Sequence, residues 1–266
     1  ALTIHVFSDW VIFNFRLRKN ANQKKNKYKV PVREMQSVSF ALTHTALSHS
    51  RPAVCGAQEN GLTLLHLVVI QGNVEKVTFL LSQEANVDIH LVCGYTPLIV
   101  AVQKRSPEIC SVLIEHGADV NMADKDSCSP LHFAAQNGDD RIVRLLLDHQ
   151  AQADSQEHEG WTSLHLASQN NFKNMARMLQ GADLERKQKN HQTPLHFAVE
   201  RGKFRVVQYL LKRGASVSCL DENHYSAFHM AAVKGKYPMC EKLIKYRANV
   251  DLRMNKGWTP LTPGLF

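Results

Sequence analysis

Several features that mark common protein classes are missing from this chain of 266 residues. No apolar run reaches the roughly 18 residues that a membrane-spanning helix needs. The six cysteines include no Cys-x-x-Cys pair, and the chain is long for a disulfide scaffold. We therefore expect reduced thiols and a cytoplasmic protein, with the nucleus as the second compartment open to it.

The motifs of several enzyme classes are missing too. The chain has no G-x-G-x-x-G or G-x-x-x-x-G-K-[ST] phosphate loop, no G-x-S-x-G elbow and no kinase catalytic loop. Neither H-E-x-x-H nor a paired-cysteine zinc pattern is present. These absences favour a protein that is not an enzyme and that uses no cofactor, metal or small-molecule substrate.

Positive charge is concentrated at the start of the chain. Residues 1–57 hold nine of the 32 Lys and Arg residues but two of the 24 Asp and Glu residues. The remaining residues therefore carry 23 bases and 22 acids, which is close to neutral. The formal net charge of +8 thus says little about the partners of the later residues.

Residues 16–33 carry eight bases and no acid. A segment of this kind can be a nuclear import signal, or it can attach to acidic lipid or nucleic acid. It can also be a disordered linker without a binding function. We expect residues 1–57 to be a basic, disordered lead-in, so that any nucleic acid or acidic lipid would bind through residues 16–33.

A short phrase of the type Thr-Pro-Leu-His recurs along the rest of the chain. Its first residues are Thr63, Thr96, Ser129, Thr162, Thr193, Ser226 and Thr259. Successive copies are 33 residues apart, except for one step of 31 residues. A fixed period near 33 indicates an array of repeated helical units, each of which can bury its apolar faces only against its neighbours.

The residues of each repeat predict two helices. Thr or Ser followed by Pro is typical of a helix N-cap and first helical residue. A glycine nine residues later suits the left-handed position that ends a short helix. A second helical pattern follows, and a polar loop then leads into the next repeat. The glycines in this position are Gly72, Gly138, Gly202 and Gly235.

This pattern resembles the ankyrin-repeat family, and the resemblance covers residues 58–266. It implies an all-α solenoid of helix-turn-helix repeats joined by hairpin loops. Six full repeats would begin near residues 58, 91, 124, 157, 188 and 221, and a truncated seventh near residue 254. The last unit stops soon after its helix would start, so we expect a piece of a longer array with Phe228, Leu243 and Ile244 partly exposed.

One histidine recurs in the phrase of five repeats. These residues are His66, His132, His165, His196 and His229. The family resemblance implies that they tie adjacent repeats through hydrogen bonds near the Thr cap. The alternative, a metal or catalytic site, would need several of them to converge on one point, whereas the array places one in each repeat.

Two repeats depart from this pattern. The fourth is two residues short after Gln180, so we expect its outer helix to end about half a turn early, or the next loop to be pulled inward. The second has Ile99 in place of His and Arg105 in place of Gly, which puts its cap and turn in doubt. We expect Asp183 and Glu185, in the loop after the short repeat, to be solvated charges.

The family resemblance also implies a binding surface on the concave side, formed by loop tips and the inner helices. Four loop residues there are aromatic, a type that is enriched in interface hot spots, although each ring could instead pack on the neighbouring loop. Polar inner-helix residues would form the floor of this surface. The candidate partner-binding residues are Tyr95, Trp161, Tyr225, Trp258, Gln136, Asn137, Gln169, Asn170, Glu200 and Arg201.

The stretches SPLHFAAQNGDDRIVRLLLDHQA and TPLHFAVERGKF resemble repeats of receptor-interacting-type ankyrin-repeat kinases and of CARD-ankyrin inflammasome adaptors. This resemblance implies a monomeric adaptor or scaffold in intracellular signalling that binds a protein partner. The alternative is a fragment of a signalling kinase whose catalytic domain lies outside this chain.

Overall fold

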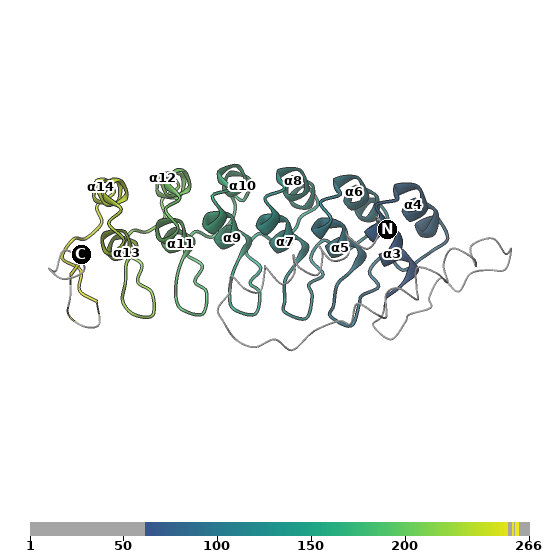
Figure 1. The fold of residues 1–266 in the computed structure, drawn as a ribbon, viewed down its shortest axis with the longest axis horizontal. Helices are drawn as coiled ribbons and strands as arrows, with labels where there is room; N and C mark the ends of the chain where they lie inside the picture. Colours follow the sequence, from purple (N-terminus) through teal and green to yellow (C-terminus); the bar gives the residue numbers. More distant parts are fainter. Residues whose placement is uncertain (1–61, 255–256, 258, 261–266) are drawn as a thin grey trace, which may run out of the picture. The chain divides into compact units, whose positions relative to one another are not determined.

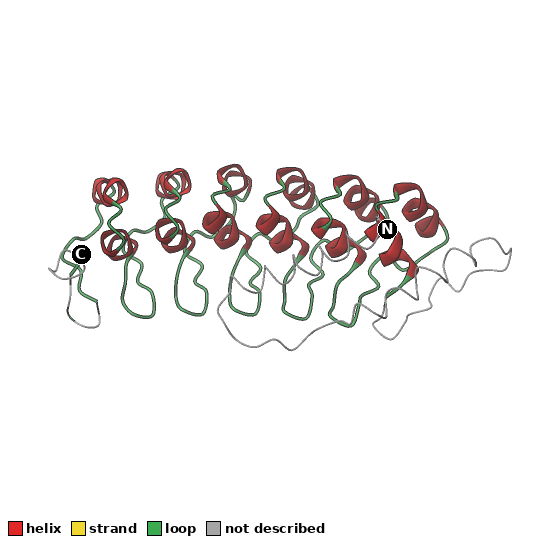
Figure 2. Cartoon of the chain, in the orientation of Figure 1, coloured by secondary structure: helices red, strands yellow, loops and turns green. Residues whose placement is uncertain are grey.

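The computed structural model describes residues 62–254, 257 and 259–260. These residues form twelve helices in six pairs, and the described part contains no named strand (Figures 1 and 2). The predicted all-helical repeat array is therefore confirmed. None of the described helices combines the length and the apolar character that a bilayer crossing requires.

The helices lie in two rows, with the hairpin loops extending beyond the inner row (Figure 1). The inner helices are α3 (Leu64–Gln71), α5 (Pro97–Gln103), α7 (Pro130–Asn137), α9 (Ser163–Asn170), α11 (Pro194–Glu200) and α13 (Ala227–Val233). The outer helices are α4 (Val74–Ser82), α6 (Pro107–Glu115), α8 (Asp140–Asp148), α10 (Lys173–Met178), α12 (Phe204–Lys212) and α14 (Tyr237–Lys245).

Each inner helix begins at the Thr or Ser of the repeated phrase. The hydroxyl of Thr96 accepts the Ile99 N–H at 3.2 Å, and that of Ser226 accepts the His229 N–H at 3.3 Å. Pro97, Pro130 and Pro194 each occupy the first helical position, where the missing N–H is not needed. The cap thus fixes where each inner helix starts relative to its loop.

The turn after each inner helix uses a left-handed residue. Gly72, Gly138, Gly202 and Gly235 have φ values of 73°, 73°, 74° and 62°. Asn171 takes the same conformation at 69°, as its short polar side chain allows. Arg105 also adopts it, with φ 56°, although its Cβ makes this conformation unfavourable. The second repeat therefore keeps the turn geometry of the others despite its different residue.

The core runs along the array between the two rows. Small residues of the inner helices, such as Ala134, Ala167 and Ala198, are fully buried and let neighbouring inner helices approach closely. Outer-helix residues such as Ile142 and Leu146 cover them from one side. Apolar burial of this kind is the main favourable term in folding, and here it is shared across every junction between repeats.

The fourth outer helix is short. Helix α10 has six residues, whereas the other five outer helices have nine each. It begins in phase with the others and ends three residues early at Met178, so the predicted early end is confirmed and is larger than half a turn. Arg213 of the next repeat donates a hydrogen bond to the Gln180 carbonyl that the shortened helix leaves free.

The expected exposure of the last full repeat is wrong for two of its three residues. Phe228 is 2% exposed and Leu243 is fully buried, whereas Ile244 is 50% exposed. Ala248, which follows α14, belongs to the apolar core, and the partly buried Val250 packs against that core.

Replacing Arg105 by glycine should stabilise the array. Glycine removes the left-handed penalty of about 1–2 kcal/mol and loses about 0.5–1 kcal/mol of chain entropy, so the free energy of unfolding should rise by about 0.5–1 kcal/mol. Lys104→Gly is the matched control, because Lys104 is already right-handed with φ −76° and should be destabilised by the change. Urea unfolding measures both; equal effects would contradict the strain at Arg105.

Candidate protein-binding surface

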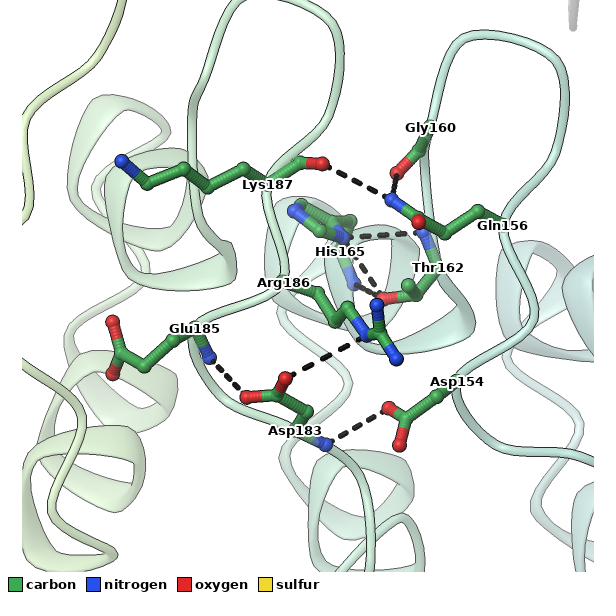
Figure 3. A network of polar contacts seen from close by, with 9 residues as sticks. All are labelled: Asp154, Gln156, Gly160, Thr162, His165, Asp183, Glu185, Arg186 and Lys187. Atoms are coloured by element: carbon green, nitrogen blue, oxygen red, sulfur yellow. Dashed lines mark hydrogen bonds and ion pairs between the residues drawn. The ribbon is translucent and has the colours of Figure 1, made fainter.

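The recurring histidines connect neighbouring repeats, and His165 is seen beside its own cap residue Thr162 in Figure 3. The Thr162 N–H donates to His165 Nδ1 at 3.1 Å, and the Thr162 hydroxyl lies 2.9 Å from the same atom. The proton of the neutral ring is therefore on Nε2, which donates to the Gln192 carbonyl of the next repeat at 3.1 Å. One buried ring thus joins the cap of one inner helix to the loop before the next.

The same arrangement occurs at other junctions. The Nε2 of His66 contacts the Tyr95 carbonyl at 3.0 Å, that of His132 the Trp161 carbonyl at 3.1 Å, and that of His196 the Cys219 carbonyl at 3.1 Å. His229 lies 2.9 Å from its cap hydroxyl. Among the described residues, no group of three metal-binding side chains comes together. For His66, His132, His165 and His196 the geometry therefore favours a structural tie to the next repeat over a metal or catalytic site.

Burial keeps these histidines neutral. Removal from water lowers the pKa of His66 and of His165 to about 4, although each accepting carbonyl opposes the shift. Burial also lowers the pKa of His132 and of His196. In His132, His165 and His196 Nδ1 accepts a hydrogen bond from a backbone N–H, so a proton on Nδ1 would clash with that donor. The hydrogen bonds between repeats therefore require the neutral histidine.

A second set of ties, which sequence reasoning missed, lies at the base of the hairpin loops. In each, a side-chain oxygen of one repeat accepts a backbone N–H of the next. The pairs are Asp88 with Asp119 at 3.0 Å, Asn121 with Gln152 at 2.8 Å, Asp154 with Asp183 at 2.8 Å and Glu185 with Ser216 at 2.7 Å. A polar residue eight residues before the next cap is the sequence signal that could have revealed them.

Glu185 is thus not the solvated charge that we expected. One of its carboxylate oxygens accepts the Ser216 N–H, and the other accepts from the Cys219 thiol at 2.9 Å. Asp183 is exposed and forms a 3.6 Å ion pair with Arg186 (Figure 3). The Glu185 carboxylate therefore bonds to the next repeat, whereas the Asp183 carboxylate interacts within its own loop.

The loop tips are also joined. Backbone N–H groups of Lys125, His158, Lys189 and Glu222 donate to carbonyls of the preceding hairpin over 2.9–3.1 Å. The amide of Gln156 bridges its own Gly160 carbonyl and the Lys187 carbonyl of the next loop at 2.8 and 3.0 Å (Figure 3). The loops therefore form one continuous wall beside the inner helices.

The aromatic residues of this wall are half-buried. The Trp161 ring lies 4.3 Å from the Phe197 ring of the next repeat, and Tyr95 contacts Phe133 edge to face at 5.7 Å. These contacts agree with the alternative in which the rings pack on their neighbours. Tyr225 contacts His229 of its own repeat at 5.8 Å. Trp258 lies outside the described residues.

The candidate floor residues divide into two groups. Gln136, Gln169, Asn170 and Glu200 are partly exposed, and Arg201 is exposed. Asn137 is 7% exposed, and its amide donates to the Val102 carbonyl at 3.1 Å. Asn137 therefore joins two inner helices and does not face a partner.

A hollow opens on this surface between the fifth and sixth repeats. Its volume is about 220 Å³, and its lining residues are Gln192, Glu200, Asp221, Asn223, Tyr225, Met230, Val233 and Lys234. The structure thus brings two candidate residues, Tyr225 and Glu200, to one depression. Its wall is partly apolar, through Met230 and Val233, and its rim is polar, a combination that suits a partner side chain.

Comparison with protein families agrees with this architecture. The family model of ankyrin repeats, in three copies, matches residues 36–124, 119–188 and 175–254. The chain belongs to the ankyrin-repeat family. The crystal structure of the ankyrin-repeat domain of Bcl-3, described as a unique member of the IkappaB family, superposes with a TM-score of 0.71. That match has 30% sequence identity and covers 76% of this chain and 94% of the other.

Curated relatives match over shorter stretches. The human ankyrin repeat and protein kinase domain-containing protein 1 is 48% identical over 52 residues, which are 20% of this chain and 7% of that protein. The mouse B-cell lymphoma 3 protein homolog is 42% identical over 62 residues, which are 23% of this chain and 14% of that protein. The chain thus spans a small part of the length of either relative.

The buried histidines predict a loss of stability in mild acid. Below pH about 6.5 the unfolded chain takes up protons at these residues, whereas folded His66 and His165 resist protonation down to about pH 4. The unfolded state therefore binds more protons in this window, and the free energy of unfolding should fall by up to about 1.4 kcal/mol per pH unit for each histidine. Urea unfolding between pH 7 and pH 5 measures this slope.

His165→Asn provides the variant for this test, because asparagine can make similar hydrogen bonds and does not titrate. We expect a smaller slope in this variant and an unchanged slope in His158→Asn, whose side chain is exposed. A stability profile that stays flat between pH 7 and pH 5 would contradict the neutral, buried histidine ties.

Proposed function

We propose that this chain is a non-catalytic module that holds an extended segment of a protein partner along its concave surface. The observation that carries the proposal is the hollow between the fifth and sixth repeats, which Tyr225 lines together with Met230, Val233 and Glu200. A partner side chain that enters this hollow would bury apolar area while its backbone reaches the polar rim.

The fixed loops support this proposal. Hydrogen bonds between repeats hold the wall and the inner helices before any partner arrives. Less conformational entropy is then lost on binding, which is how a preorganised surface gains affinity. Tyr225 is the central anchor in this proposal. Tyr95 and Trp161 contribute less, because their rings already pack on Phe133 and Phe197.

The relatives support a signalling setting for the proposed module. We propose a signalling adaptor, as the likeness to the IkappaB-family protein Bcl-3 suggests. We further propose that this adaptor is monomeric and acts in the cytoplasm or in the nucleus. We also propose that its repeats are related most closely to those of receptor-interacting-type kinases or CARD-ankyrin adaptors. The human relative that combines ankyrin repeats with a kinase domain favours one alternative, in which the chain is part of a signalling kinase.

Tyr225→Ala tests the proposal. Truncating a central aromatic anchor should weaken binding by at least about 2 kcal/mol, or roughly thirtyfold. Recovery of copurifying proteins with the full chain, measured by quantitative mass spectrometry, should fall accordingly. Phe79→Ala is the matched control, because Phe79 is an aromatic residue on the outer helix α4 that is 63% exposed. Circular dichroism confirms that both variants fold.

Two outcomes would count against the proposal. Equal recovery with the wild-type chain and with Tyr225→Ala would remove the hollow as the binding site. Equal loss with Tyr225→Ala and Phe79→Ala would place the partner on a surface other than the concave one.

A further inference from the structure

Acidic and basic residues are distributed unevenly along the array, although their numbers nearly balance over the whole of it. Residues 62–187, which hold the first four repeats, carry ten bases and sixteen acids. Residues 188–254, which hold the fifth and sixth repeats, carry twelve bases and five acids. The array is therefore acidic over most of its length and strongly basic at the repeats that form the hollow.

Five of these bases follow the ends of the inner helices α11 and α13, and we call them the basic strip. They are Arg201, Lys203, Arg205, Lys234 and Lys236. The nine corresponding positions of the first three repeats carry three acids, Glu75, Glu108 and Asp139, and two bases, Lys104 and Arg141. Lys234 lines the hollow, and Arg201 directly follows its lining residue Glu200, so the strip continues the hollow.

Hydrogen bonds bring the strip residues of the sixth repeat close to those of the fifth. The Lys236 ammonium group crosses from the sixth repeat to the fifth, where it donates to the Val199 and Glu200 carbonyls at 2.9 and 2.6 Å. Burial lowers the pKa of Lys236, and the nearby charges of Lys234, Lys203 and Arg201 lower it further, against the opposing effect of Glu200. The bases are thus close enough to repel one another.

The strip has little internal compensation. Glu200 pairs with Lys234 at 3.1 Å. Among the described residues, no ion pair includes Arg201, Lys203 or Arg205, and the side chains of Arg201 and Arg205 are exposed. Because these clustered bases repel one another, an anionic partner that neutralises them would bind favourably.

We propose that the basic strip binds an acidic polypeptide segment, whose several Asp or Glu residues face the strip while an apolar residue enters the hollow. This inference rests on the proposed function, in which the array binds an extended protein segment. It adds the chemical class of that segment and the repeats that select it.

The charge of the other repeats favours a short acidic segment over nucleic acid. A nucleic acid strand that continued along the array would meet repeats that carry six more acids than bases. Like charges within the Debye length of about 10 Å at 0.1 M salt repel one another. A polypeptide can confine its carboxylates to the stretch that crosses the fifth and sixth repeats, and can present neutral or basic residues elsewhere.

Fluorescence anisotropy with a synthetic probe tests the proposal. The probe is a peptide of glutamates around one central leucine, roughly twelve residues long, so that at about 3.3 Å per residue it spans two repeats. The protein is the full chain in which all eight bases of residues 16–33 are changed to Gln, so that this segment cannot attract the probe by its charge. These bases are Arg16, Arg18, Lys19, Lys24, Lys25, Lys27, Lys29 and Arg33. A single-stranded DNA of similar length is measured in parallel.

The strip variant is Arg201→Gln, Lys203→Gln and Arg205→Gln together. The control variant is Lys76→Gln, Arg141→Gln and Arg144→Gln, which removes the same charge from exposed residues of α4 and α8. At about 0.1 M salt we expect the strip variant to bind the peptide about tenfold more weakly, which corresponds to about 1.4 kcal/mol. The control variant should bind within about twofold of the parent.

Equal peptide affinities for the strip and control variants would overturn the proposal. It would also be overturned if the strip variant lost affinity for the DNA and not for the peptide, because the strip would then be a nucleic-acid site. Either result would leave the proposed function standing as long as Tyr225→Ala still reduces partner recovery. An unchanged recovery with Tyr225→Ala would instead remove the proposed function itself.

Discussion

Every other feature of this structure depends on contact between neighbouring repeats, because no single pair of helices can bury its apolar faces alone. Fully buried alanines let the inner helices approach, and at four junctions this approach brings a buried histidine within reach of the next loop. The ring then satisfies a cap and a carbonyl that would otherwise be buried without partners, a loss that costs about 1–3 kcal/mol for each group. Packing and hydrogen bonding therefore stabilise the same junctions. Because the loops are bonded at these junctions, the loop wall is held rigid.

That rigidity is what makes the concave side suitable for recognition. The side-chain ladder through Asp88, Asn121, Asp154 and Glu185 fixes the base of the loops, and backbone hydrogen bonds fix their tips. Partner specificity can then differ along the array without any change of fold. Bulky rings of neighbouring repeats meet at Trp161 and Phe197, whereas the fifth repeat has Gln192 in the same loop position, and the hollow opens there.

The phase of the repeats, the caps and the all-helical fold could be predicted from the sequence, because they depend on local residue preferences that recur with a fixed period. Three features could not. Asn137 has the same local setting as its partly exposed neighbour Gln136, and its burial depends on the distance to the Val102 carbonyl of the preceding repeat. Glu185 reads as a solvated loop residue until the next repeat places Ser216 N–H beside it. The basic strip does not show in the net charge of the array, because the acidic excess of residues 62–187 nearly cancels the basic excess of residues 188–254.

Amide hydrogen exchange in His165→Ala tests most directly whether the repeats stabilise one another's loops. The substitution removes the donor to the Gln192 carbonyl, so the account predicts faster exchange in the loop of the following repeat, at residues 188–193, as well as near Thr162. Faster exchange confined to the fourth repeat, with protection of residues 188–193 unchanged, would contradict it.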